Sequence, residues 1–166
     1  KPFTAIAALE SGLYDRNTII STHPGRMRVG RDVVQDRGQN FGDVTLQGML
    51  VNSSNIASAK IALAVGHEAL RDVLLRVGFG ENPASGFPGE RAGVMPNHRI
   101  WHDIELATLS FGYGMSTSAL QLAQAYSVIA NKGLRVPVTL LKDGNEMAGA
   151  SEPQRVIDAN VAGQVQ

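Results

Sequence analysis

Two apolar segments flank a short polar block, Asn52-Ser53-Ser54-Asn55, and together they dominate the hydrophobic pattern of the chain. The apolar segments cover residues 44–51 and 56–65, and both have the spacing of helices. Ser and Asn side chains compete for nearby backbone groups, so four together indicate a junction between helices. Such a junction can present hydroxyl and amide groups to a cleft. The alternative is that Ser54 or Asn55 only caps the second helix.

The rest of the pattern predicts an α+β fold that is mostly α-helical. Apolar residues at helical spacing predict helices over 1–12, 67–77, 103–109 and 116–130, the last capped by Ser116 or Thr117. Runs with β-branched residues predict short strands at 18–21, 27–34 and 134–141. Residues 80–99 are rich in Pro and Gly and are expected to form a long ordered loop. The tail, residues 143–166, suggests only a helix from Ile157.

Length and charge narrow the class of protein. A chain of 166 residues is expected to form one domain with a real core. Fifteen basic and fifteen acidic residues cancel without forming a basic cluster, which argues against a nucleic-acid partner. No segment has the apolar length of a membrane span. Because the chain starts at Lys1 without an initiator Met and enters a helix at once, we expect it to be a piece of a longer protein.

The sequence offers few residues for metal or cofactor chemistry. There are no cysteines, and the four histidines are scattered without metal-ligand spacing. Neither of the glycine-rich nucleotide-binding motifs occurs, and the serines lack a Gly-x-Ser-x-Gly elbow. We therefore predict no metal and no cofactor.

A hydroxyl, an amide and one lysine remain as candidates for catalysis. Ser53 and Asn55 lie two residues apart, so in a tight connection both can face one cleft with Ser54 turned away. If Lys1 also points there, its amine can exchange protons with a serine, provided that burial and a nearby positive charge lower its pKa. The alternative for Lys1 is a solvated chain end.

Several motifs in order resemble the class B penicillin-binding proteins of the septal (FtsI) type. Lys1-Pro2-Phe3 is similar to the second half of a Ser-x-x-Lys motif, and Ser53-Ser54-Asn55, about fifty residues later, is similar to the Ser-x-Asn motif. Longer stretches are also similar to the family over roughly residues 1–142: Pro88-Gly89-Glu90-Arg91-Ala92-Gly93, Trp101-His102-Asp103-Ile104, Ser110-Phe111-Gly112-Tyr113-Gly114 and 120–126.

The resemblance implies that residues 1–166 are the helical portion of a transpeptidase domain with the fold shared by serine β-lactamases. Most of the central sheet would lie outside the chain. It implies a serine D,D-transpeptidase that cross-links peptidoglycan stem peptides ending in D-Ala-D-Ala and is a target of β-lactams. By resemblance Lys1 would be the base, Ser53 would relay a proton and Asn55 would bind the substrate backbone. Further substrate contacts would come from Ser54, Tyr113, Gly114 and Arg37.

Two departures from the family pattern leave alternatives open. No serine stands three residues before Lys1, and Lys142-Asp143-Gly144 has a carboxylate where the family's Lys-Thr/Ser-Gly motif has a hydroxyl. We therefore expect the 166-residue chain alone to be inactive, and a catalytically inert scaffold or binding module of the same fold is the first alternative. A class A β-lactamase is a weaker alternative, because the Glu-x-x-Leu-Asn setting of its deacylating glutamate does not occur.

The resemblance also implies partners and a location. The parent protein would act with a septal glycosyltransferase and other division proteins. It would sit at the periplasmic face of the bacterial inner membrane, held by an N-terminal span outside this chain.

Overall fold

The computed structural model describes residues 1–97, 101–140 and 152–166. The chain divides into two compact units, and the boundary falls within one helix, α4 (His67–Arg76). Unit 1 contains residues 1–73 and 96–115, and unit 2 contains residues 74–95 and 116–164. The sequence predicted one domain, whereas the backbone contacts separate two units, each with its own buried residues.

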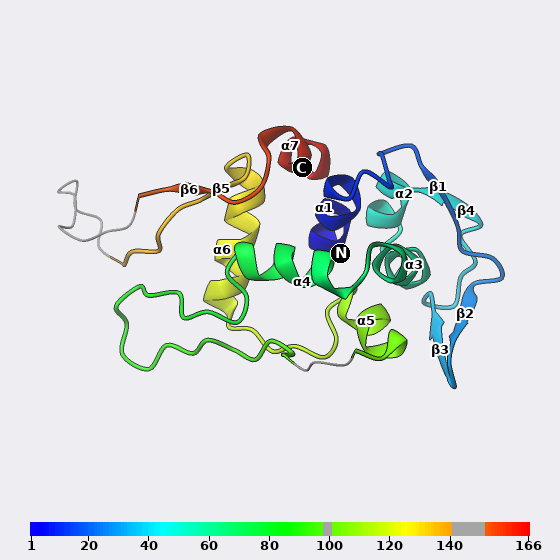
Figure 1. Cartoon of the computed structure of the whole chain (residues 1–166), viewed down its shortest axis with the longest axis horizontal. Coiled ribbons are helices and arrows are strands. Elements are labelled where there is room, and N and C mark those ends of the chain that lie inside the picture. The colour runs from blue at the N-terminus through cyan, green and yellow to red at the C-terminus, as the bar shows by residue number, and fades with distance from the viewer. Residues whose placement is uncertain (98–100, 141–151) are drawn as a thin grey trace. The chain divides into compact units, whose positions relative to one another are not determined.

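Unit 1 is built around helix α3 (Asn55–Val65), which packs against α1 (Pro2–Glu10), α5 (Asp103–Leu109) and α2 (Leu46–Val51) (Figure 1). Apolar and small residues cover most of α3, as expected for a helix buried on several sides. On one side it packs in a cluster with Ala5, Ala8, Ile20, Val44, Leu46 and Met49, and on another with Val29, Val34 and Ala107. The polar block identified in the sequence therefore lies at the start of the central helix.

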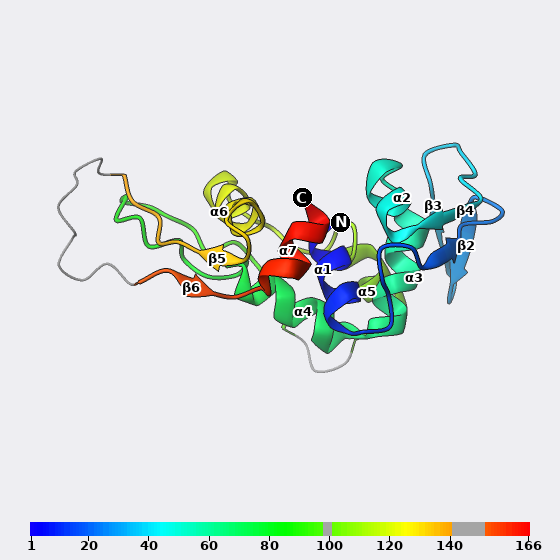
Figure 2. The same ribbon diagram turned by 90° about the horizontal axis from the view of Figure 1, so that it is seen from above.

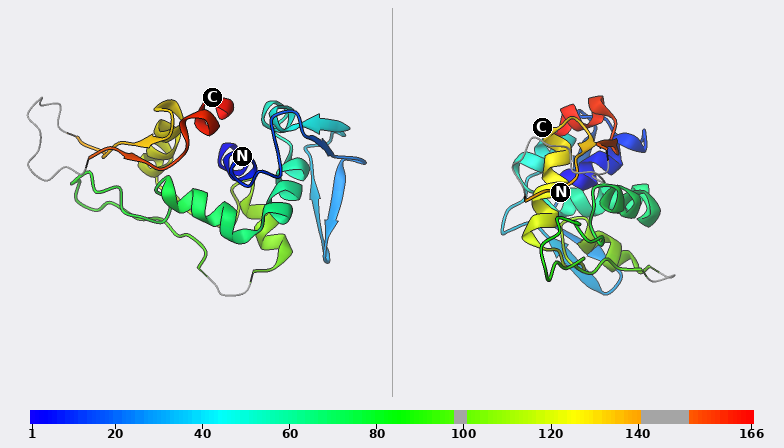
Figure 3. Two further views of the ribbon diagram at one scale, coloured as in Figure 1. Left: turned by 45° about the horizontal axis from the view of Figure 1, so that its top comes forward. Right: turned by 90° about the vertical axis from the view of Figure 1, so that its left-hand side faces the viewer.

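The strands of unit 1 form two separate two-stranded antiparallel sheets. In one, β1 (Ile19–Ser21) pairs with β4 (Asp43–Thr45), with Ile20 opposite Val44. In the other, β2 (Arg26–Val29) and β3 (Asp32–Gln35) form a hairpin with Arg28 opposite Val33 (Figure 3). Strand β1 and the β2–β3 hairpin confirm the strands predicted within 18–34. Residues 44 and 45 of strand β4 were predicted as helix, because Val44 continues the apolar pattern of α2.

Unit 2 contains α6 (Ala119–Ala130), α7 (Ala159–Val165) and the short pair β5 (Leu134–Arg135) and β6 (Gln154–Arg155), which lie side by side in Figure 2. Helix α6 packs against β5. The fully buried Gln121 donates from Nε2 to the carbonyls of Glu81 (2.8 Å) and Ala92 (2.7 Å), so its side chain holds part of the Pro- and Gly-rich loop. The same loop is fixed by a bridge between Val94 and Ser116.

Four predicted element boundaries were wrong for local reasons. Helix α1 begins at Pro2 with Lys1 as its N-cap. Ser118 caps α6 instead of Ser116 or Thr117, because Gln121 completes a capping box with it. The described part of the strand predicted at 134–141 is a strand only over Leu134–Arg135, since Pro137 cannot donate a ladder hydrogen bond. The last helix begins at Ala159, where the Asp158 carboxylate accepts from two backbone amides.

The mostly helical content and the minority of strand agree with the predicted fold class. Lys142-Asp143-Gly144 lies outside the described residues. Within the described residues, no helix is both long and apolar enough to span a bilayer.

Candidate active site

The dipeptide Ser53-Ser54 joins the end of α2 to the start of α3. The Ser53 amide donates to the Leu50 carbonyl (3.1 Å) and the Ser54 amide to the Met49 carbonyl (3.0 Å), which is the Schellman pattern of a helix C-terminus. This pattern needs a left-handed residue after the cap, usually Gly, and here Ser53 takes that conformation with φ of 53°. Its side chain is exposed at the turn.

Ser54 is the N-cap of α3 and is fully buried. Its Oγ accepts from the Ala57 amide (3.0 Å) and donates to Oδ2 of Asp36 (2.9 Å). With 0% exposure and both roles of the hydroxyl used, Ser54 presents no surface to a ligand in this structure. We therefore withdraw Ser54 from the predicted substrate contacts, and the capping hypothesis holds for this residue.

The Asp36 carboxylate binds the first turn of α3 from outside the helix. Its Oδ1 accepts from the amides of Asn55 (2.5 Å) and Ile56 (3.1 Å), and its Oδ2 accepts from the Ser54 hydroxyl. The side chain is buried, with 3% exposure. A carboxylate at a helix N-terminus satisfies unpaired amides and is favoured by the helix dipole. Asp36 therefore fixes the junction that carries Ser53 and Asn55.

Ser53 and Asn55 differ in how firmly their side chains are held. The Asn55 amide group donates to the Gln35 carbonyl at the end of β3 (3.1 Å). The Ser53 hydroxyl makes no hydrogen bond within the described part of the chain. An exposed, uncommitted hydroxyl beside an oriented amide is what a proton relay and a substrate contact would require.

Lys1 lies in the same unit, at the start of α1, with its Nζ 5.7 Å from the centroid of the Phe111 ring. Burial lowers the pKa of the Lys1 side chain, the Asp36 carboxylate opposes this by raising it, and the Arg37 guanidinium lowers it further. Burial and a positive neighbour were the conditions that the sequence analysis set for Lys1 to exchange protons with a serine, and both lower its pKa here. Lys1 is therefore electrostatically coupled to Asp36, the carboxylate that binds the start of α3.

Phe111 is brought to Lys1 by a contact between two helices. The Thr4 hydroxyl on α1 donates to the Ser110 carbonyl at the end of α5 (2.7 Å), and both groups are buried. The Phe111 ring then makes an edge contact with Tyr113, with centroids 5.9 Å apart. Tyr113 is 70% exposed and Arg37 is exposed, so both are accessible to a ligand; Gly114 is exposed as well. That these three bind substrate stays a prediction.

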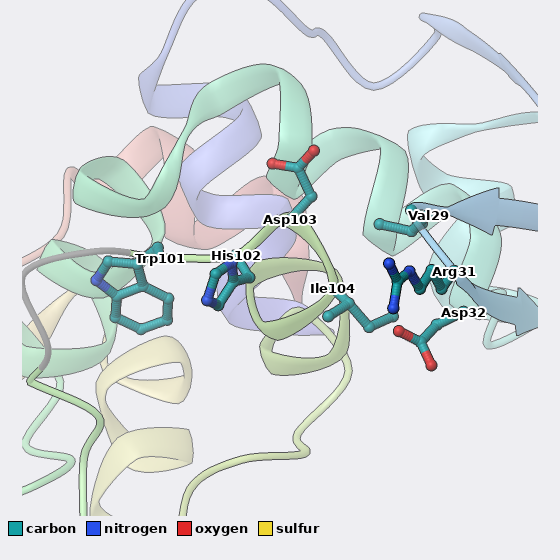
Figure 4. Close-up of a pocket in the computed structure, with 8 residues that line it drawn as sticks. Val29, Arg31, Asp32, Trp101, His102, Asp103 and Ile104 are labelled. Carbon is teal, nitrogen blue, oxygen red and sulfur yellow. The ribbon is translucent and has the colours of Figure 1, made fainter.

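A separate pocket in unit 1 does not coincide with the predicted site. It is formed between the β2–β3 turn, with Val29, Gly30, Arg31 and Asp32, and the segment Trp101–Ile104 that leads into α5 (Figure 4). None of the residues that the sequence analysis selected for catalysis or substrate binding lines it. Among the described residues, no group of three or more His, Asp or Glu side chains could hold a metal ion.

Asp36 and the Gln35 carbonyl are the site components that the sequence analysis missed. The sequence did contain a signal. The first amides of any α-helix have no partner within the helix, and among the described residues the Ser54 hydroxyl accepts only from the amide of Ala57. The two amides before Ala57 therefore need an acceptor from another element, and the buried Asp36 carboxylate supplies it.

Comparison with known proteins places the whole chain in one family. The family model of the penicillin binding protein transpeptidase domain matches residues 1–166. The chain is 44% identical over 157 residues to the probable peptidoglycan D,D-transpeptidase PbpC of Pseudomonas aeruginosa, covering 93% of this chain and 27% of the relative. It is 37% identical over 142 residues to the peptidoglycan D,D-transpeptidase FtsI of Escherichia coli K12, covering 86% of this chain and 24% of the relative.

The chain is also similar in fold to a solved structure. The apo transpeptidase domain of Burkholderia pseudomallei penicillin-binding protein 3 superposes with a TM-score of 0.91 at 36% identity, covering 99% of this chain and 49% of that chain. The chain thus spans about a quarter of the length of the curated relatives it matches and about half of the solved domain. On the family match and these similarities, the chain belongs to the penicillin-binding protein transpeptidase domain family.

Proposed function

We propose that this chain carries part of the acyl-transfer site of a serine D,D-transpeptidase that cross-links peptidoglycan stem peptides. The observation that carries the proposal is the match of residues 1–166 to the transpeptidase domain family, with Lys1, half-buried beside Phe111, at the position where the family resemblance calls for a base. The names of the relatives favour an enzyme over an inert scaffold. Ser53 and Asn55 stand at a junction held by a buried carboxylate, as a preorganised site requires.

The proposed reaction has two halves. In the first, the family's nucleophilic serine adds to the carbonyl carbon of the D-Ala-D-Ala amide and its proton passes to the neutral amine of Lys1. The C–N bond then breaks, and the leaving D-Ala nitrogen receives the proton held by Lys1 through the hydroxyl of Ser53. In the second half, the amine of another stem peptide attacks the ester carbonyl carbon, the C–O bond to the serine breaks, and the proton lost by the amine returns to the serine oxygen. Asn55 would hold the substrate backbone, and Tyr113, Gly114 and Arg37 would contact its flanks.

A β-lactam would enter the same first half. Opening of the lactam ring leaves the nitrogen tethered to the acyl group, so the ester persists and can be detected. We expect the complete gene product to label stoichiometrically with a fluorescent penicillin. Lys1→Met, which keeps the length of the side chain and removes the base, should slow acylation by about 10²–10⁴-fold.

Lys132→Met is the matched control, because Lys132 is an exposed lysine of unit 2. It should label at the wild-type rate. A gene product that does not label at all, or a Lys1→Met variant that labels as fast as the control, would show that this assignment is wrong.

We further propose a role in cell division, with a septal glycosyltransferase and other division proteins as partners, at the periplasmic face of the inner membrane. The similarity to FtsI of Escherichia coli supports this finer assignment. A fluorescent fusion of the complete gene product should collect at the division site. Uniform labelling of the lateral wall would instead favour a role in elongation.

A further inference from the structure

We propose that Asp36 is a positioning residue for the active site: its carboxylate holds the first turn of α3, and with it Ser53 and Asn55, and its charge acts on the amine of Lys1. This inference rests on the proposed function and adds a residue outside the motifs that suggested it. It assigns one buried side chain two tasks, one geometric and one electrostatic.

The geometric task follows from the contacts of the carboxylate. Three donors from consecutive residues, the Ser54 hydroxyl and the amides of Asn55 and Ile56, converge on its two oxygens at 2.5–3.1 Å. The preceding residue contributes as well, since the Gln35 carbonyl accepts from the Asn55 side chain. The end of β3 therefore holds both the backbone and the amide side chain at the start of α3.

Asp36 is itself held by its surroundings. Its amide donates to the Gly25 carbonyl (3.3 Å), and its carbonyl accepts from the Gly38 amide (2.6 Å). Gly25 has a φ of 85°, and a Cβ there would lie 3.0 Å from the Gln39 carbonyl oxygen. The backbone at Gln39 therefore packs closely against Gly25, which only glycine allows without strain. Because Asp36 is held by hydrogen bonds at both its backbone and its carboxylate, it can fix the position of the first turn of α3.

The electrostatic task concerns the protonation of Lys1. Asp36 and Arg37 are the charged groups of the β3–β4 segment that act on the Lys1 amine, and the Phe111 ring faces it from the segment after α5. Asp36 raises the pKa of Lys1, against the larger effect of burial. The same carboxylate thus favours the ammonium form and fixes the hydroxyl and amide beside it, so movement of Asp36 would disturb both together.

Three variants of the complete gene product separate these tasks. Asp36→Asn keeps an oxygen for the Asn55 and Ile56 amides and removes the charge. Asp36→Ala removes the acceptor oxygen as well as the charge. Ser54→Ala removes the hydroxyl contact and leaves the carboxylate and its charge in place. Ser118→Ala, which removes the serine N-cap of α6 in unit 2, controls for loss of a cap as such.

The rate of penicillin acylation is measured against pH. The rate should rise with pH as Lys1 loses its proton, so the midpoint of the rise follows the Lys1 pKa. Because Asp36 raises that pKa, Asp36→Asn should move the midpoint to lower pH, whereas Ser54→Ala and Ser118→Ala should leave it in place. Asp36→Ala should in addition lower the maximal rate by about 10²-fold, the scale expected when catalytic groups are misplaced by about an ångström.

Amide hydrogen exchange provides a readout that does not depend on activity. In Asp36→Ala the Asn55 and Ile56 amides should exchange about 10–10²-fold faster, the scale of losing a hydrogen bond to a charged group. In Ser54→Ala the Ala57 amide should lose protection while the other two keep theirs. Circular dichroism confirms that each variant is folded.

The outcomes are distinguishable. The positioning role is overturned if the wild-type protein acylates and neither variant differs from it as expected. In that case the midpoint of Asp36→Asn is unchanged, and the rate of Asp36→Ala stays within about twofold of wild type. Unchanged exchange in Asp36→Ala overturns the geometric task directly. A wild-type protein that does not acylate overturns the proposed function and the role toward Lys1, while the exchange experiment still reports whether the carboxylate holds the helix.

Discussion

Helices α3 and α6 both begin with a serine N-cap, yet their first turns are completed in different ways. At α6 the cap is local: Ser118 Oγ accepts from the Gln121 amide (3.2 Å), and Gln121 Oε1 accepts from the Ser118 amide (2.9 Å). At α3 the third position is Ala57, and the amide of the cap serine donates to the Met49 carbonyl. Asp36, 18 residues before the cap, accepts from the hydroxyl of the cap serine and from the next two amides. The α6 start can be recognised in four residues of sequence, whereas the α3 start needs the tertiary structure.

The difference indicates what each helix start is for. The side chain that completes the α6 cap continues into buried structure, where Gln121 binds two loop carbonyls. The α3 start instead leaves the Ser53 hydroxyl exposed and places a charge near Lys1. On the proposed function, the α6 start keeps its contacts internal for stability, and the α3 start keeps the Ser53 hydroxyl available for chemistry.

The sharpest test of the comparison is Ser53→Ala in the complete gene product. If the α3 start serves proton transfer, penicillin acylation should slow by about 10²–10⁴-fold. The free energy of unfolding should change by less than about 0.5 kcal/mol, because the side chain is exposed. Stopped-flow acylation and urea unfolding measure the two quantities. A variant that loses stability but acylates normally would make the α3 start structural like that of α6.

Gln121→Leu should have the largest effect on stability. It leaves the Glu81 and Ala92 carbonyls without their buried donor and should lower the free energy of unfolding by about 2–4 kcal/mol. Gln124→Leu is the matched control on the same helix. The Oε1 of Gln124 is buried and has no partner among the described residues, so removing it should leave stability unchanged or improved. Equal losses in urea unfolding would contradict the role given to Gln121.

Ser118→Ala should have a smaller effect, confined to stability. Loss of an N-cap serine costs about 1 kcal/mol. The rate of acylation should stay at the wild-type value, because this cap contacts only its own helix and the adjoining loop. Differential scanning calorimetry and penicillin labelling of the same samples decide the point. Slower labelling by this variant would remove the distinction between the two helix starts.

The smallest expected effect comes from Arg37→Gln. The Arg37 guanidinium lowers the pKa of Lys1, so its removal should raise that pKa and move the midpoint of the acylation profile to higher pH. This direction is opposite to that expected for Asp36→Asn. Because Arg37 is exposed, solvent screens its charge, and added salt should reduce the shift. Shifts of the same sign in both variants would show that the effects are structural.

Regular elements were largely predictable because their patterns are local. The residues of α3, α4 and α5 show helical spacing of apolar side chains, and the predicted ranges agree with the structure. The strand β4 was not predictable from its three residues, because its conformation depends on pairing with β1 more than twenty positions earlier. The division into two units also rests on contacts between distant segments.

For the candidate site, the sequence was enough to select the polar residues but not the buried carboxylate that holds them in place. Ser53, Asn55 and Lys1 could be selected because a polar junction and a resemblance mark them. Ser54 was assigned to the substrate by resemblance, and the structure shows that it is a buried cap beside the exposed hydroxyl of Ser53. Asp36 lies in a segment with no motif, so its role depends on the fold that returns β3 to α3.

The left-handed conformation of Ser53 bears on how this sequence could change over evolutionary time. The same helix-ending pattern occurs after α4, with Gly78 in the left-handed position, and after α6, with Lys132 there. Glycine avoids the steric cost of roughly 1–2 kcal/mol that other residues carry in this conformation. Selection for heat resistance alone would therefore favour glycine at both 53 and 132. If Ser53 relays a proton as proposed, selection for activity would accept glycine only at 132, so position 53 is where the two pressures would favour different residues.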